Sequence, residues 1–167
     1  MRISKPVIGI AVGSISYIGR TLYEKFISTA EEPAIGAPIY CDLAPGMEHS
    51  GIYVGNGEVV ALRGSGYIEK VSLKTFTHGY LPNHYIHYPK ESQCDMRLGS
   101  RRAAQRAMAK VGSRRHYNLI GDNCHQFTAG CLTGDFENDD NFLYRLKDIA
   151  KRTLNGGDDI EWAVWDW

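Results

Sequence analysis

The segment Glu48-His-Ser-Gly-Ile-Tyr-Val-Gly-Asn-Gly-Glu-Val-Val-Ala-Leu-Arg63 contains the strongest structural signal in this chain. Two runs rich in β-branched residues, Glu48–Val54 and Glu58–Arg63, flank Gly55-Asn56-Gly57. An Asn-Gly pair between two such runs favours a β-hairpin, because both residues tolerate the positive φ that tight turns need. The segment therefore predicts two antiparallel strands joined by a tight turn.

Further strands are predicted on both sides of this hairpin, at Pro38–Leu43, Tyr67–Leu73 and His84–Tyr88, with Pro89 ending the last one. No helical pattern separates these strands from one another. Parallel pairing needs a long crossover connection, which the turns between them do not provide. We therefore expect an antiparallel meander.

Helical patterns occupy the second half of the chain. Ser100 is a suitable N-cap for a helix over Arg101–Val111, and its predicted apolar face is Ala103, Ala104, Ala107, Met108 and Val111. Further helices are predicted over Cys124–Thr133 and Asn138–Leu154, the latter with a buried stripe of Phe142, Leu143, Leu146, Ile149, Ala150 and Thr153. The Trp-rich tail Asp158–Trp167 is expected to dock as an extended segment. Together these elements predict an α+β fold in which an antiparallel sheet packs against helices.

The N-terminal segment at residues 7–27 has three interpretations. Ser14–Ala30 carries Ile18, Leu22 and Phe26 at helical spacing, which fits a helix packed on the domain. The same apolar residues fit a peripheral membrane contact, or the core of a cleaved secretion signal. The run is too short for a transmembrane helix, which needs roughly 20 apolar residues.

The composition narrows the class of protein. The 167 residues carry 19 Lys+Arg and 19 Asp+Glu, a net charge of 0, whereas nucleic-acid binding usually demands a basic face. The four cysteines, at positions 41, 94, 124 and 131, form no Cys-x-x-Cys pair, so no zinc site is predicted. We expect a reduced, cytoplasmic protein with no metal, no cofactor and no nucleic-acid partner.

One cysteine stands where a helix is predicted to begin. Asn123 is a favourable N-cap, and Cys124 follows it in the first turn. A thiol in that position meets the positive end of the helix dipole, which predicts a lowered pKa. The first-turn N–H groups at Asn123 and His125 are candidates to cap the helix and to hold an oxyanion during acyl transfer.

A nucleophilic thiolate also needs an imidazole partner. His49 lies on a predicted strand beside Gly51, where the missing side chain is expected to leave room for substrate or for the cysteine. His125 directly follows Cys124, and adjacent helical residues point about 100° apart. We therefore interpret His125 as an exposed or capping residue and His49 as the better partner.

The two segments together resemble the lecithin:retinol acyltransferase family. Glu48-His49-Ser-Gly-Ile-Tyr-Val-Gly is similar to its histidine-strand motif, and Asn123-Cys124-x-x-Phe127 to its Asn-Cys motif. The resemblance covers roughly residues 36–134 and implies one domain over 1–167, with a helical extension at 1–33 and a C-terminal helix and Trp-rich tail at 138–167. It also implies a circularly permuted papain-like fold.

By this resemblance, Cys124 is the nucleophile and His49 the general base of a thioester-forming acyltransferase or hydrolase. The substrate it implies is an acyl-ester lipid or a peptide or isopeptide amide, and the sequence leaves these alternatives open.

Two positions depart from the family pattern. Ala61 stands where the family often has a second histidine, so His78, His84, His87 or a backbone carbonyl must orient His49. His125 and Gln126 replace the usual Glu-His pair after the cysteine. A three-residue turn at 55–57 would place His49 opposite Arg63, whereas a two-residue turn at 56–57 would face it toward Leu62 and Gly64. The Arg63 side chain must turn away in a working site, because its charge disfavours the imidazolium. The missing histidine also supports the alternative of an inactive binding module on the same fold.

Overall fold

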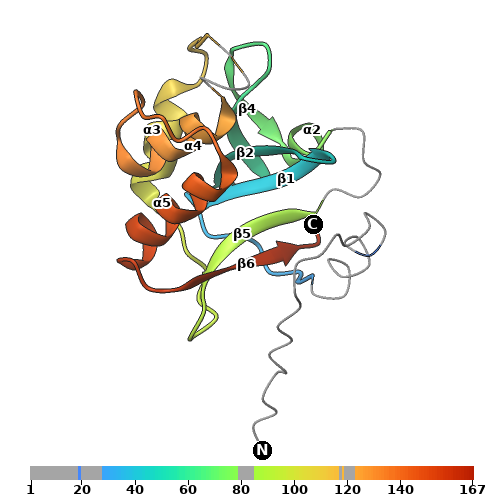
Figure 1. Ribbon diagram of the computed structural model, residues 1–167. Coiled ribbons are helices and arrows are strands. Elements are labelled where there is room, and N and C mark those ends of the chain that lie inside the picture. Colours follow the sequence, from blue (N-terminus) through green and yellow to red (C-terminus); the bar gives the residue numbers. More distant parts are fainter. Residues whose placement is uncertain (1–18, 20–27, 79–84, 117, 119–122) are drawn as a thin grey trace, which may run out of the picture.

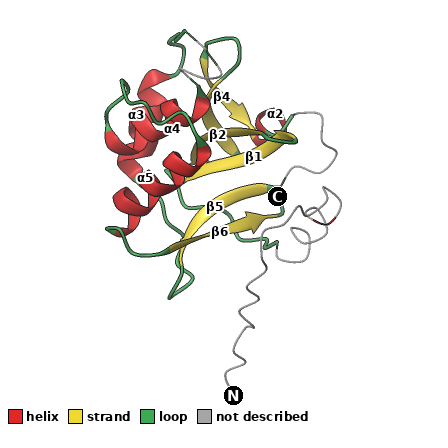
Figure 2. Cartoon of the chain, in the orientation of Figure 1, coloured by secondary structure: helices red, strands yellow, loops and turns green. Residues whose placement is uncertain are grey.

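The computed structural model describes residues 19, 28–78, 85–116, 118 and 123–167. Six strands form one sheet in the order β4-β3-β2-β1-β5-β6, with antiparallel pairing throughout (Figures 1 and 2). Their bounds are β1 Pro38–Ala44, β2 Met47–Gly55, β3 Glu58–Leu62, β4 Ile68–Ser72, β5 Ile86–Glu91 and β6 Ile160–Trp165. The predicted α+β fold with an antiparallel sheet is confirmed.

Helices cover this sheet unequally. The longer ones, α3 (Arg101–Lys110), α4 (Cys124–Thr133) and α5 (Leu143–Asn155), gather on one side, and the short α2 (Leu73–Phe76) lies apart from them (Figure 1). Ile52 and Val60 from the central strands share a buried cluster with Phe127 of α4. The predicted packing of the hairpin on the cysteine helix is therefore confirmed.

The hairpin has the register expected of a three-residue turn. Ile52 pairs with Val60 and Tyr53 with Val59, and a bulge precedes the Gly55–Glu58 pair. Asn56 and Gly57 adopt φ of 56° and 70°, the left-handed conformation that their sequence predicts. Continued through the strands, this register sets Gly51 opposite Ala61 and His49 opposite Arg63.

The two faces of β2 meet different surroundings. Side chains alternate along a strand, so Ser50 shares the face of Ile52, and His49 shares the face of Tyr53. Tyr53 belongs to a second buried cluster with Phe76 of α2 and Trp165 of β6. Ser50 thus points toward the long helices, and His49 toward α2.

Several element boundaries differ from the prediction. β5 continues through Pro89, whose carbonyl accepts a hydrogen bond from the Leu98 N–H at 3.0 Å. In a strand, the nitrogen and the carbonyl of one residue point in the same direction. The Pro89 nitrogen, which has no hydrogen to donate, therefore faces away from β6, and the pairing with β6 loses no hydrogen bond. The strand expected over Tyr67–Leu73 ends instead at Ser72, whose hydroxyl caps the unpredicted helix α2.

The third long helix begins later than predicted. α5 starts at Leu143, because the side chains of Asp135 and Asn138 accept hydrogen bonds from the N–H groups of Glu137 and Asp140 and hold this segment in turns. Phe142 is 53% exposed and lies outside the stripe in which we expected it. The stripe itself is confirmed at the buried residues Leu146, Ile149 and Ala150, whereas Thr153, also expected in it, is exposed.

On α3, the expected apolar face is only half buried. Its three alanines, Ala103, Ala104 and Ala107, are buried. Met108 and Val111 are exposed, and Val111 is the C-cap residue that follows the helix.

At the N-terminus, Thr29 forms a parallel bridge with Trp165, so the predicted helix does not extend to Ala30. The rest of the segment at 7–27, apart from the helical Gly19, lies outside the described residues, and so do its three interpretations. Among the described helices, none is long and apolar enough to cross a membrane.

Candidate functional site

Helix α4 begins at Cys124, where the sequence predicts it. Asn123 has an extended backbone, and its side-chain oxygen accepts hydrogen bonds from the N–H groups of His125 at 2.9 Å and Gln126 at 3.2 Å. The Asn123 side-chain amide in turn donates to the carbonyl of Asn141 at 2.7 Å. The cap therefore positions the cysteine. The N–H of His125, which we predicted as an oxyanion donor, already donates to the Asn123 side chain.

The Cys124 thiol is enclosed by protein. Only 4% of the residue is exposed, and burial raises the pKa of the thiol. Hydrogen bonding by the backbone and hydroxyl of Ser50, and by the backbone of Cys124 and His125, acts in the opposite direction and favours the thiolate. The predicted lowering of the thiol pKa is wrong, because the loss of solvation against β2 outweighs the helix terminus.

His125 is buried, not exposed as predicted. Nearly every residue of α4 is buried, so the His125 side chain does not reach solvent even though it points about 100° away from that of Cys124. The Nδ1 atom of His125 lies 2.8 Å from the Ser50 hydroxyl, which lies 3.1 Å from the hydroxyl of Thr128. Sequence reasoning missed Ser50 and Thr128. The signal available was the strand alternation that sends Ser50 to the opposite face from His49.

His49 occupies a buried apolar environment. Its ring centroid lies 4.8 Å from that of Phe76, and the Nε2 atom is buried without a hydrogen-bond partner among the described residues. Burial, followed by the charges of Arg63 and His125, lowers the pKa of the imidazole to about 3. The resting imidazole is therefore neutral and has a nitrogen available for a proton.

The expected open space beside His49 is absent. A Cβ atom at Gly51 would lie 2.7 Å from a methyl group of Val59 and 2.8 Å from the carbonyl oxygen of Val60. Glycine is needed here because β3 approaches closely, so this position provides no room for substrate.

Ser50 brings the thiol and the imidazole into one region. It follows His49 in the chain, and both its backbone and its hydroxyl act on the Cys124 sulfur. Cys41, the cross-strand partner of His49, is also near enough for a Cys124 thiolate to raise its pKa. All four cysteines are free thiols.

The family model for lecithin retinol acyltransferase matches residues 31–137. The chain belongs to the lecithin retinol acyltransferase family. The match covers more than half of the chain and contains both His49 and Cys124. No curated protein matches the chain. Membership in this acyltransferase family indicates acyl transfer that depends on a thiol in general.

Ala61 stands where the lecithin retinol acyltransferase pattern often has a second histidine, and this fully buried apolar residue offers no group that could orient His49. His87 stacks on Tyr40, with ring centroids 4.5 Å apart, and Tyr40 pairs with Ser50. His87 therefore lies on the face of Ser50 and not on that of His49.

The structure gives no support for the other two histidines in this role. His78 is exposed after α2, and His84 lies outside the described residues. The Arg63 side chain reaches the Thr75 carbonyl at 3.5 Å and Glu69 at 3.9 Å, yet its charge still acts on His49.

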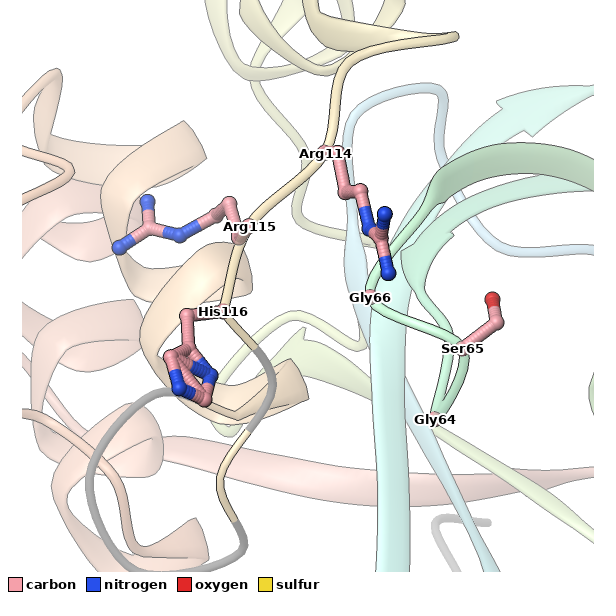
Figure 3. Close-up of a pocket in the computed structure, with 6 residues that line it drawn as sticks. All are labelled: Gly64, Ser65, Gly66, Arg114, Arg115 and His116. Atoms are coloured by element: carbon pink, nitrogen blue, oxygen red, sulfur yellow. The ribbon is translucent and has the colours of Figure 1, made fainter.

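A basic cavity of about 540 Å³ is the second feature of this part of the fold, lined by Gly64, Ser65, Gly66, Arg114, Arg115 and His116 (Figure 3). The Arg114 side chain points toward the glycine turn, whereas Arg115 points away and donates to the carbonyl of Phe136 at 2.8 Å (Figure 3). Its wall is closely packed at Gly66, because a Cβ atom there would lie 2.6 Å from the Arg115 carbonyl oxygen. Among the described residues that line this cavity, none carries a negative charge.

Proposed function

We propose that this chain is a thiol-dependent acyltransferase or hydrolase, with Cys124 as nucleophile and His49 as general base. The proposal rests on family membership and on one observation in the site. A helix-terminal thiol interacts with Ser50, the residue next to an imidazole whose buried Nε2 has no hydrogen-bond partner among the residues that the structure describes.

The pKa directions favour a resting pair in which both groups are neutral. The sulfur attacks the acyl carbonyl while its proton moves to Nε2 of His49, so no separated charges are buried beforehand. The tetrahedral intermediate then collapses to a thioester on Cys124, and His49 returns the proton to the leaving alcohol or amine. Water or an acceptor alcohol or amine attacks the thioester in the second half-reaction, and His49 takes its proton and returns it to the Cys124 sulfur as the sulfur leaves.

The basic cavity supports an acyl-ester lipid with an anionic group over a peptide or isopeptide amide. Gly64, which lines the cavity, directly follows Arg63 in the sequence, and the charge of Arg63 acts on His49. The cavity is therefore linked to the proposed catalytic region through adjacent residues of one strand end. The guanidinium of Arg114, 5.2 Å from the Tyr67 ring centroid, is suited to pair with a phosphate group.

The experiment is acyl-enzyme trapping followed by intact-protein mass spectrometry. The protein is incubated with a short-chain phosphatidylcholine and, separately, with an N-acyl peptide. We expect the ester to add one acyl mass, which peptide mapping assigns to Cys124. Cys131→Ala is the matched control, because it removes another buried thiol from the same helix. Without any adduct or turnover on either donor, the alternative of an inactive binding module on the same fold would replace the proposal.

A further inference from the structure

A buried chain of hydrogen bonds links Cys124 to a second imidazole. Thr128 donates its hydroxyl hydrogen to the carbonyl of Cys124 at 2.7 Å. Thr128 has one such hydrogen, so the contact of 3.1 Å between the two hydroxyls requires Ser50 to donate to Thr128. The Ser50 oxygen then accepts from Nδ1–H of His125 at 2.8 Å. The geometry thus assigns the proton of neutral His125 to Nδ1.

We propose that His125 positions the Ser50 hydroxyl as a hydrogen-bond donor to the Cys124 sulfur. This inference deepens the proposed function by adding Ser50 as a group that touches the reacting atom and His125 as a positioning residue. Ser50 turns its hydrogen from Thr128 to the sulfur when Cys124 loses its proton. Its oxygen keeps the bond from His125 throughout.

The chain fits the chemistry of a buried thiol. A thiolate without solvent needs donors fixed in advance, and hydrogen bonds to charged groups are stronger than those between neutral groups. The groups that act on the region from neighbouring elements are His49 and Arg63 from the hairpin and Cys41 from β1. None of them donates to Ser50 in the hydrogen-bond chain, so His125 is the donor that the variants must remove.

The test measures iodoacetamide alkylation of Cys124 against pH, which does not require turnover. Ser50→Ala is expected to reduce the alkylation rate at pH 8 about tenfold, and His125→Phe to reduce it in the same direction. His125→Asn, which keeps an N–H near the Nδ1 position, is the matched control and should stay close to the wild type. Circular dichroism confirms that each variant is folded.

A separate measurement needs no variant. Two-dimensional ¹H–¹⁵N NMR of the wild type should show the His125 proton on Nδ1. A proton on Nε2 instead, or an unchanged alkylation profile in folded Ser50→Ala, would overturn the inference. If acyl-enzyme still forms, either result would contradict only the role of Ser50 and His125, and the proposed function would remain. If acyl-enzyme does not form but the alkylation and NMR results are as expected, the proposed function is wrong and the hydrogen-bond chain remains.

Discussion

Acidification should destabilise this fold through two buried histidines. Burial is the main cause that lowers the pKa of His49 to about 3, and it lowers that of His125 to about 4, from an ordinary value of 6.5. Below pH 6.5 these two histidines therefore bind protons in the unfolded chain but stay neutral in the folded chain. The free energy of unfolding must fall as the pH drops from 6.5 toward these values.

The expected size follows from the two pKa values. Between pH 7.5 and pH 5, each histidine is expected to cost about 2 kcal/mol of stability, since one pKa unit corresponds to about 1.4 kcal/mol. Together they remove about 4 kcal/mol, a large part of the ~5–15 kcal/mol that stabilises a typical domain.

The assay is urea unfolding at pH 7.5 and pH 5 for the wild type and His49→Gln. The variant is expected to lose about 2 kcal/mol less than the wild type between the two pH values, whatever its stability at pH 7.5. His78→Gln is the control, because it makes the same substitution at an exposed histidine. If His49→Gln and the wild type lose the same free energy, His49 is not a buried neutral imidazole, and its proposed role as base fails.

Three further outcomes are expected. Alkylation of Cys124 by iodoacetamide should keep rising through pH 9 without a plateau, because burial raises the thiol pKa; a plateau below pH 8 would contradict this. Gly51→Ala should destabilise the protein by about 1–3 kcal/mol in urea unfolding, since the new methyl group meets Val59 and the β3 backbone, and a neutral effect would show that β3 can move. Arg114→Gln should raise KM several-fold for a phosphate-bearing acyl ester and leave that of an uncharged ester unchanged; an equal effect on both would exclude the cavity as an anion site.

The hairpin shows which parts of the fold are predictable from the chain alone. Gly55, Asn56 and Gly57 adopt their conformations because of properties of the residues themselves, and the register follows from the turn length. The beginning of α4 at Cys124 is equally local, since it depends on the side chain of Asn123 and the two N–H groups after it. Local hydrogen bonding and turn conformation are visible in sequence, and these two predictions were confirmed.

The electrostatic state of the site was decided by packing. A helix terminus favours the Cys124 thiolate, yet β2 covers that terminus and desolvation reverses the direction of the pKa shift. His125 is polar and adjacent to the cysteine, but the burial of α4 on all sides turns it toward Ser50 from a distant strand. The glycine at position 51 led us to expect open space beside His49, but β3 fills that space. Sequence alone determined that the thiol begins a helix and that the imidazole lies in a hairpin strand, because both elements depend on neighbouring residues. Tertiary structure alone decided their protonation and their partners, because both depend on which atoms replace water.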